Sequence, residues 1–128
     1  MLTLLVVDDS AVMRRMVVKS LSIGGLPIGK VFEADGGERA LDILNQQWID
    51  LVLCDINMPN MNGIELVERM VADTLTAKVP VVMVTTERSE ERIRQLERLG
   101  VTAYLNKPFR PEDLAQTVRE VLGLGGPT

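Results

Sequence analysis

The chain has 128 residues, 46% hydrophobic content and a formal net charge of -4 at pH 7, which suit a single domain with its own core and argue against nucleic-acid binding through a basic face. One cysteine excludes a disulfide framework and favours the reducing cytoplasm, and no apolar run is long enough to cross a membrane. Histidine, the commonest metal ligand and general base, is absent, so any acid-base or metal chemistry must use carboxylates.

Five apolar runs alternate with five segments that have helical spacing. The predicted strands are residues 2–7, 31–34, 51–55, 80–84 and 101–106, and the predicted helices are residues 10–21, 40–44, 64–71, 89–99 and 112–122. The run from Leu51 to Asp55 is apolar at consecutive positions until the aspartate, as is typical of a parallel strand covered on both faces. This alternation predicts an α/β fold with a doubly wound, five-stranded parallel sheet, because each parallel connection needs a crossover.

Apolar spacing also predicts which helix faces are buried. In the first helix the predicted inward residues are Val12, Met13, Met16, Val17 and Leu21. The fourth helix has only a narrow apolar stripe, so we expect it to be mostly exposed. Between the third strand and the third helix, Pro59 and Gly63 are expected to turn the chain, with Gly63 in a backbone conformation that side chains disfavour.

Polar residues lie at the ends of four of the predicted strands or directly after them, as Asp8-Asp9, Asp55, Thr85-Thr86 and Lys107. In an open α/β sheet the functional crevice lies outside the carboxyl ends of the strands, so these residues are expected to share one rim. Taken singly, each has an ordinary structural explanation as a helix cap, a strand end or a turn residue. Their joint placement favours a functional site.

The residue types at this rim indicate phosphoryl transfer. Neighbouring strands lie ~4.8 Å apart, so Asp8, Asp9 and Asp55 crowd together if the first and third strands pair. Such a cluster needs a cation, and all-oxygen coordination suits Mg²⁺. Lys107 adds a positive charge, Thr85 adds a hydroxyl that can donate to a phosphoryl oxygen, and Asp55 is the predicted nucleophile. As a rim residue, Lys107 is expected to contribute little to the core, so that Lys107→Ala should fold normally.

Four motifs carry a resemblance to a known family. They are Val6-Val7-Asp8-Asp9-Ser10 with Met13-Arg14, Asp55-Ile56-Asn57-Met58-Pro59-Asn60-Met61-Asn62-Gly63, Val84-Thr85-Thr86-Glu87 and Tyr104-Leu105-Asn106-Lys107-Pro108-Phe109. From about Leu4 to Leu122 the chain resembles the receiver domains of bacterial two-component response regulators, in particular the single-domain chemotaxis regulators. The resemblance implies a flavodoxin-like three-layer sandwich with strand order 2-1-3-4-5. It also implies a receiver domain over residues 1–123, and the composition of residues 124–128 predicts a flexible tail.

The resemblance implies a signalling phosphoprotein that promotes its own phosphorylation and dephosphorylation, rather than an enzyme with a separate substrate. Asp55 would accept a phosphoryl group from a phosphohistidine of a sensor histidine kinase. Asp9, Asp55 and the backbone carbonyl of Asn57 would hold Mg²⁺, with Asp8 acting through bound water. The absence of histidine from this chain fits a donor on another protein.

A conformational switch is also implied by the resemblance. Lys107 would pair with the phosphoryl group, next to a cis peptide bond to Pro108. Thr85 would move toward the phosphoryl group and Tyr104 would turn inward, which remodels the face formed by the fourth helix, the fifth strand and the fifth helix. Access to the phosphoryl group would be flanked by Asn57, Thr86 and Glu87. Thr86 stands where many members carry alanine or glycine, and its bulk is expected to narrow this access.

The implied partners are a sensor histidine kinase and an output protein such as the flagellar motor switch. The protein itself is expected to be a cytoplasmic monomer that binds neither nucleic acid nor membranes. Two alternatives stay open within the family: a freestanding relay receiver that passes its phosphoryl group to another histidine protein, and the receiver part of a longer response regulator. A phosphatase of the haloacid dehalogenase type is disfavoured, because Asp55-Ile56-Asn57 lacks the second aspartate and lies on the third strand. A flavodoxin-like electron carrier is disfavoured, because Asp8-Asp9 would repel the flavin phosphate.

Overall fold

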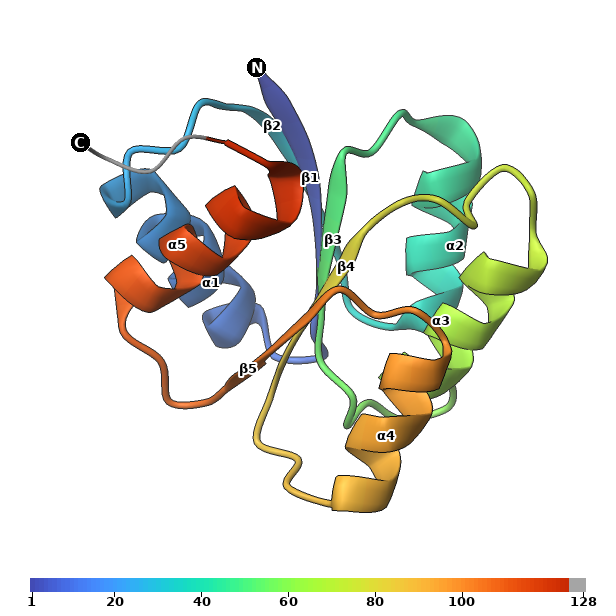
Figure 1. The fold of residues 1–128 in the computed structure, drawn as a ribbon. Coiled ribbons are helices and arrows are strands. Elements are labelled where there is room, and N and C mark those ends of the chain that lie inside the picture. Colours follow the sequence, from blue (N-terminus) through green and yellow to red (C-terminus); the bar gives the residue numbers. More distant parts are fainter. Residues whose placement is uncertain (125–128) are drawn as a thin grey trace.

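The computed structural model describes residues 1–124, and the rest of the predicted tail lies outside the described residues. Five strands and five helices alternate along this part of the chain (Figure 1). The strands are β1 (Leu2–Val7), β2 (Ile28–Ala34), β3 (Leu51–Cys54), β4 (Val81–Thr85) and β5 (Ala103–Asn106). The helices are α1 (Ala11–Ile23), α2 (Gly37–Gln46), α3 (Gly63–Ala72), α4 (Glu90–Arg98) and α5 (Pro111–Leu122). None of these helices is long and apolar enough to cross a membrane.

The strands form one parallel sheet in the order β2-β1-β3-β4-β5, which confirms the predicted doubly wound fold. Figure 1 shows α1 and α5 on one face of the sheet and α2, α3 and α4 on the other. Successive side chains of a strand point to opposite faces, and here both faces are covered. In β1, Leu4 and Val6 join the core beneath α1 and α5, whereas Leu5 and Val7 join the core beneath the other helices. This double coverage explains why the central strands are apolar at consecutive positions.

β2 begins at Ile28, before its predicted start at residue 31. The register of the sheet explains the difference, because Leu2 at the start of β1 pairs with Ile28. A Cβ on Gly29 would lie 2.7 Å from the Cβ of Met1, so glycine lets this edge strand pass close to the first residue. Pro27 and Gly29 resemble turn signals in the sequence, but pairing with β1 extends the strand through this region.

The buried face of α1 differs from the predicted one. Val12 and Met16 are 60% and 51% exposed, whereas Val17 is buried. Val17 and Leu21 join the core shared by the sheet and α5, and α5 packs closely against the end of α1, where a Cβ on Gly24 would lie 2.3 Å from the Cβ of Ala115. Each helical residue advances by about 100°, so Met16 and Val12 lie roughly 100° and 140° around the helix from Val17. The prediction that Val12 and Met16 point inward was therefore wrong.

The loop between β3 and α3 needs glycine for space rather than for an unusual backbone angle. Asn60, not Gly63, has a positive φ in this loop, at 68°. Gly63 is the first residue of α3, and a Cβ there would lie 2.3 Å from the Asp55 carbonyl oxygen. Asn62 caps the helix by accepting a hydrogen bond from Glu65 N–H at 2.9 Å, and the Glu65 carboxylate accepts one from Asn62 N–H. The helix therefore starts directly against the segment that carries Asp55.

The two ends of the sheet differ in chemistry. Before the start of β3, Trp48 is 82% exposed and its Nε1–H donates to Asp50 Oδ1 at 3.0 Å. A hollow of about 460 Å³ opens there, lined in part by Trp48, Leu75 and Lys78. The predicted polar rim lies at the other end, beyond the carboxyl ends of the strands. Trp48 is thus separated from Asp55 by the whole length of β3.

Candidate functional site

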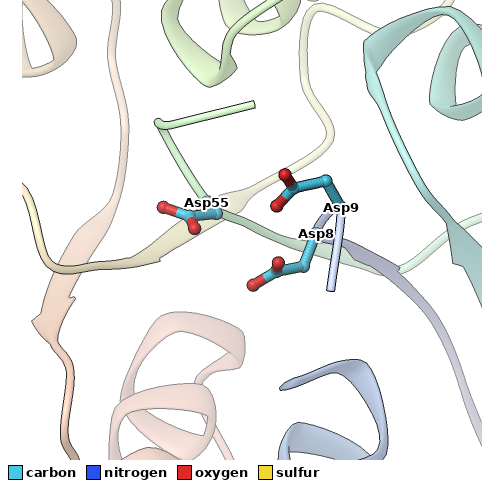
Figure 2. Close-up of side chains that lie close together, drawn as sticks. All are labelled: Asp8, Asp9 and Asp55. Carbon is cyan, nitrogen blue, oxygen red and sulfur yellow. The ribbon is translucent and has the colours of Figure 1, made fainter. Parts of the chain in front are cut away.

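Three carboxylates meet beyond the carboxyl ends of β1 and β3. Val7 pairs with Cys54 across these strands, and Asp55 N–H donates to the Val7 carbonyl at 3.0 Å. The residues that follow each strand therefore become neighbours. Asp8, Asp9 and Asp55 each offer a carboxylate oxygen, and these oxygens lie within 4.8 Å of one another (Figure 2). Asp8 and Asp55 are 4% and 8% exposed, whereas Asp9 is exposed.

Lys107 joins two of these carboxylates. Its Nζ lies 2.8 Å from Asp8 Oδ2 and 3.0 Å from Asp55 Oδ2, and its side chain is only 12% exposed. Burial by itself lowers the pKa of Lys107, but the hydrogen bonds and negative charges of Asp8 and Asp55 outweigh it and raise the pKa above the ordinary lysine value. The peptide bond between Lys107 and Pro108 is cis, as the resemblance implied. The burial of the Lys107 side chain and its two ion pairs argue against the expectation that Lys107 contributes little to the core.

Within residues 1–124, hydrogen bonds hold the Asp8 carboxylate, whereas none holds the Asp9 carboxylate. Asp8 N–H donates to the Ala34 carbonyl at 3.1 Å, and Asp8 Oδ1 accepts a hydrogen bond from Ser10 N–H at 2.9 Å. Its second carboxylate oxygen is paired with Lys107. Within residues 1–124, no donor is hydrogen-bonded to the Asp9 carboxylate. The Asp9 carboxylate can therefore offer an oxygen to a cation without giving up a hydrogen bond.

The donor set fits a hard divalent cation. Asp8, Asp9 and Asp55 supply oxygen ligands only, and one ammonium group offsets only part of their negative charge. Cys54 is buried, and burial raises the pKa of its thiol, so it stays protonated and is no ligand. Asp55 Oδ1 accepts a hydrogen bond from Asn57 N–H at 3.3 Å, which brings the Asn57 backbone beside the cluster. Such an arrangement can bind a metal ion.

Thr85, Glu87 and Tyr104 form a chain of hydrogen bonds that leads away from the carboxylates. Thr85 is fully buried at the end of β4, and its carbonyl accepts a hydrogen bond from Lys107 N–H at 2.9 Å. Its hydroxyl oxygen accepts one from Glu87 N–H at 3.1 Å, and the Glu87 carbonyl accepts one from the Tyr104 hydroxyl. Burial raises the pKa of Tyr104, the Glu87 carboxylate raises it further, and Arg88 opposes the shift. The Glu87 backbone thus links Thr85 to Tyr104.

The residues expected to flank phosphoryl access lie in two environments. Asn57 and Thr86 are exposed. The Glu87 carboxylate is engaged at the start of α4, where Oε1 accepts a hydrogen bond from Ser89 N–H at 3.0 Å and Oε2 lies 3.5 Å from Arg92 Nη1. Asn57 and Thr86 are therefore accessible to solvent, whereas the Glu87 carboxylate is turned toward α4.

Two contacts near the site were not predicted. One is the backbone link through Glu87, which no side-chain pattern can indicate. The other is Arg14, whose guanidinium contacts the Asp8 carbonyl and the Glu33 carboxylate. The sequence indicated this contact only by the position of Arg14, a basic residue early in the helix that follows Asp8-Asp9 and outside the apolar face of that helix.

Comparison with known families agrees with this geometry. The family model for the response regulator receiver domain matches residues 4–119. The chain belongs to this family. This receiver domain is 39% identical over 123 residues to a chemotaxis protein CheY homolog of Campylobacter jejuni, with 95% of this chain and 93% of the relative covered. It is 40% identical over 121 residues to chemotaxis protein CheY1 of Helicobacter pylori, with 94% and 96% covered.

Solved structures and longer relatives match as well. The structure of Vibrio cholerae chemotaxis protein CheY4 has a TM-score of 0.85 and 36% identity, and the match covers 95% of this chain and 99% of that one. The phosphate regulon transcriptional regulatory protein PhoB of Escherichia coli is 36% identical over 120 residues, which cover 93% of this receiver domain but only 51% of PhoB. Receiver sequences similar to this one therefore occur both as nearly whole proteins and as about half of a longer one.

Proposed function

We propose that this receiver domain is a phosphorylation-activated signalling switch. A carboxylate oxygen of Asp55 attacks the phosphorus of a phosphohistidine on a sensor histidine kinase, the P–N bond breaks, an O–P bond forms, and the imidazole leaves. The observation that supports this most is Lys107, whose Nζ lies 3.0 Å from Asp55 Oδ2 inside an otherwise acidic site. A fixed cation beside the nucleophile offsets the negative charge of the incoming phosphoryl group.

Mg²⁺ is the proposed cofactor, held by Asp9, Asp55 and the backbone carbonyl of Asn57, with Asp8 acting through bound water. When bound, the ion neutralises the cluster and offsets charge on the phosphoryl group. Asp8 is fixed by its hydrogen bonds, so it can orient this bound water. Lys107 contacts both buried carboxylates and can pair with the phosphoryl group on Asp55. The protein acts on itself and turns over no separate substrate.

Phosphorylation is proposed to reach the output face through Thr85. A phosphoryl group on Asp55 offers new acceptors to the Thr85 hydroxyl, whose oxygen now accepts a hydrogen bond from Glu87 N–H. A movement of Thr85 changes the Glu87 backbone, and with it the carbonyl that holds Tyr104. The face of α4, β5 and α5 then differs between two states. Thr86, exposed beside Thr85, narrows access to the phosphoryl group.

We propose chemotaxis as the output, with the flagellar motor switch as the partner of this face and residues 1–123 as the receiver domain. The support is that relatives named as chemotaxis proteins are covered over 93% and 96% of their own length. The receiver part of a longer response regulator is the second candidate, and the match to about half of PhoB favours it.

Labelling with acetyl phosphate tests the phosphorylation site. With Mg²⁺ present, one phosphoryl group should be added per chain, as detected by intact-protein mass spectrometry. Asp55→Asn should abolish labelling, whereas Asp42→Asn, at an exposed position on α2, should not change it. Excess chelator should also abolish it. Labelling that persists in Asp55→Asn or in chelator contradicts the proposal.

Beryllofluoride, a phosphoryl mimic, tests the output. Amide chemical-shift changes should extend from Asp55 through Thr85 and Glu87 to Tyr104 and α4. Changes confined to the loops after β1 and β3 would show that the hydrogen-bond chain does not transmit the signal. A peptide from the flagellar motor switch should bind more tightly when the mimic is present, and an unchanged affinity would count against the chemotaxis output.

A further inference from the structure

Arg14 lies next to the acidic cluster and reaches it only through the backbone. Its Nη1 donates to the Asp8 carbonyl at 2.6 Å, and its Nε donates to Glu33 Oε1 at 2.9 Å. The Arg14 side chain is 16% exposed and that of Glu33 is 44% exposed. The guanidinium therefore joins three parts of the fold: α1, the turn after β1, and the edge strand β2.

The hydrogen bond from Arg14 acts on the peptide group that leads into Asp9. The Asp8 carbonyl and the Asp9 N–H belong to one planar group, so a donor fixed on this carbonyl fixes the plane from which Asp9 departs. On the other side of Asp8, its N–H is held by the Ala34 carbonyl at 3.1 Å. The exposed Asp9 carboxylate has no hydrogen bond of its own within residues 1–124. Its placement near Asp55 thus depends on the backbone that Arg14 holds.

We propose that Arg14 is a positioning residue for the cation site, which holds the Asp8-Asp9 peptide so that the Asp9 carboxylate stays beside Asp55. This inference rests on the proposed function, in which Asp9 is a Mg²⁺ ligand. Arg14 acts through the peptide and contacts no carboxylate of the cluster. A guanidinium suits this role because its planar set of donors binds the Glu33 carboxylate and the Asp8 carbonyl at the same time.

Electrostatics and positioning predict opposite effects for the loss of Arg14. Its positive charge lies beside an acidic cluster, so removal of that charge by itself would strengthen the binding of a divalent cation. Loss of the hydrogen bond to Asp8 would weaken binding, because Asp9 would no longer be held ready to coordinate. The direction of the change in Kd therefore separates the two effects.

Isothermal titration calorimetry of the full chain with MgCl₂ measures this direction. Arg14→Gln should weaken Mg²⁺ binding by about tenfold, the lower end of what the loss of a supporting contact costs a metal site. Arg15→Gln is the matched control, because Arg15 is the exposed neighbour on α1 and forms no ion pair within residues 1–124. It should leave Kd unchanged or slightly lower. Arg14→Lys keeps the charge and one donor group, and should recover part of the loss.

Thermal unfolding in chelator separates positioning from a merely structural role. A structural role alone would lower the unfolding midpoint of Arg14→Gln and leave its Kd for Mg²⁺ unchanged, which overturns the proposal. A Kd of Arg14→Gln equal to or below that of the wild type also overturns the proposal. The same holds if Arg15→Gln weakens Mg²⁺ binding as much as Arg14→Gln does. In both cases the proposed function stands. If Arg14→Gln does not fold, an unchanged Kd in Arg14→Lys overturns it. Absence of Mg²⁺ binding by the wild type overturns the proposed function and the role of Arg14 together.

Discussion

Replacement of Lys107 by methionine tests what stabilises the acidic cluster when no metal ion is bound. Methionine keeps a similar length and removes the charge. The two ion pairs of Lys107 are 2.8 and 3.0 Å long, and the side chains of Lys107, Asp8 and Asp55 are only 12%, 6% and 10% exposed. Removal of one partner from a buried pair leaves the other charge uncompensated, at a cost of about 3–5 kcal/mol. We expect about 3 kcal/mol, the low end of that range, because Asp8 keeps its hydrogen bond from Ser10 N–H.

Urea unfolding in excess chelator, followed by far-UV circular dichroism, measures this loss. Trp48 fluorescence is a poor probe of unfolding, because the side chain is already 82% exposed in the folded protein. A loss of ~3 kcal/mol in a domain of this size corresponds to a fall in Tm of roughly 10 °C. Lys19→Met, at an exposed position on α1, is the control and should change the free energy of unfolding by less than ~0.5 kcal/mol.

A double-mutant cycle with Asp55→Asn isolates one of the two ion pairs. We expect a coupling energy of about 1–2 kcal/mol between Lys107 and Asp55, because residues in one contact network are not additive. The pKa of Lys107 is raised in the folded protein, so the charged side chain stabilises the fold fully at pH values below 10.5, the ordinary lysine pKa. This stabilisation is lost as the pH rises through the raised pKa of the folded protein. A Lys107→Met variant within ~0.5 kcal/mol of the wild type would refute this reasoning and return Lys107 to the status of a peripheral charge.

Three further predictions concern other parts of the molecule. Tyr104 is the only tyrosine, so an alkaline absorbance titration follows the ionisation of this side chain alone. Burial should place the pKa of Tyr104 above 10.0 in the folded protein, and unfolding in urea should return it toward 10.0. A pKa at or below 10.0 in the folded protein would contradict the packing of Tyr104. Gly63→Ala should lower the free energy of unfolding by about 3 kcal/mol. Gly36→Ser is the control and should not lower it, because a Cβ at Gly36 meets no atom within 4 Å. Equal stability of the two variants would show that the loop between β3 and α3 relaxes around the added methyl group. Trp48 emission should barely respond to Mg²⁺, since β3 separates the indole from Asp55 by roughly 20 Å, and a saturable quench at the calorimetric Kd would contradict this placement.

Local sequence pattern determined most of the fold and the membership of the rim. A strand covered on both faces must be apolar at consecutive positions, and a helix with one buried face repeats every 3.6 residues, so each segment carries its own signal. The alternation of strand and helix patterns predicted the parallel sheet. Because functional sites of such sheets lie outside the carboxyl ends of the strands, the sequence also predicted that Asp8, Asp9, Asp55 and Lys107 lie at one edge. The strand order came from the family resemblance, because no local pattern specifies which strands are neighbours.

Tertiary structure alone decided how these residues are packed. The buried face of α1 is the one whose Val17 and Leu21 join the core shared with α5, so helical spacing alone misplaced Val12 and Met16. Gly63 is needed because the Asp55 carbonyl lies against it, not because of its own backbone angle. Lys107 is buried because carboxylates from the ends of β1 and β3 both reach it. In each case the deciding atoms belong to residues outside the helix or strand concerned, and a periodic pattern records whether a side chain is buried but not which atoms surround it.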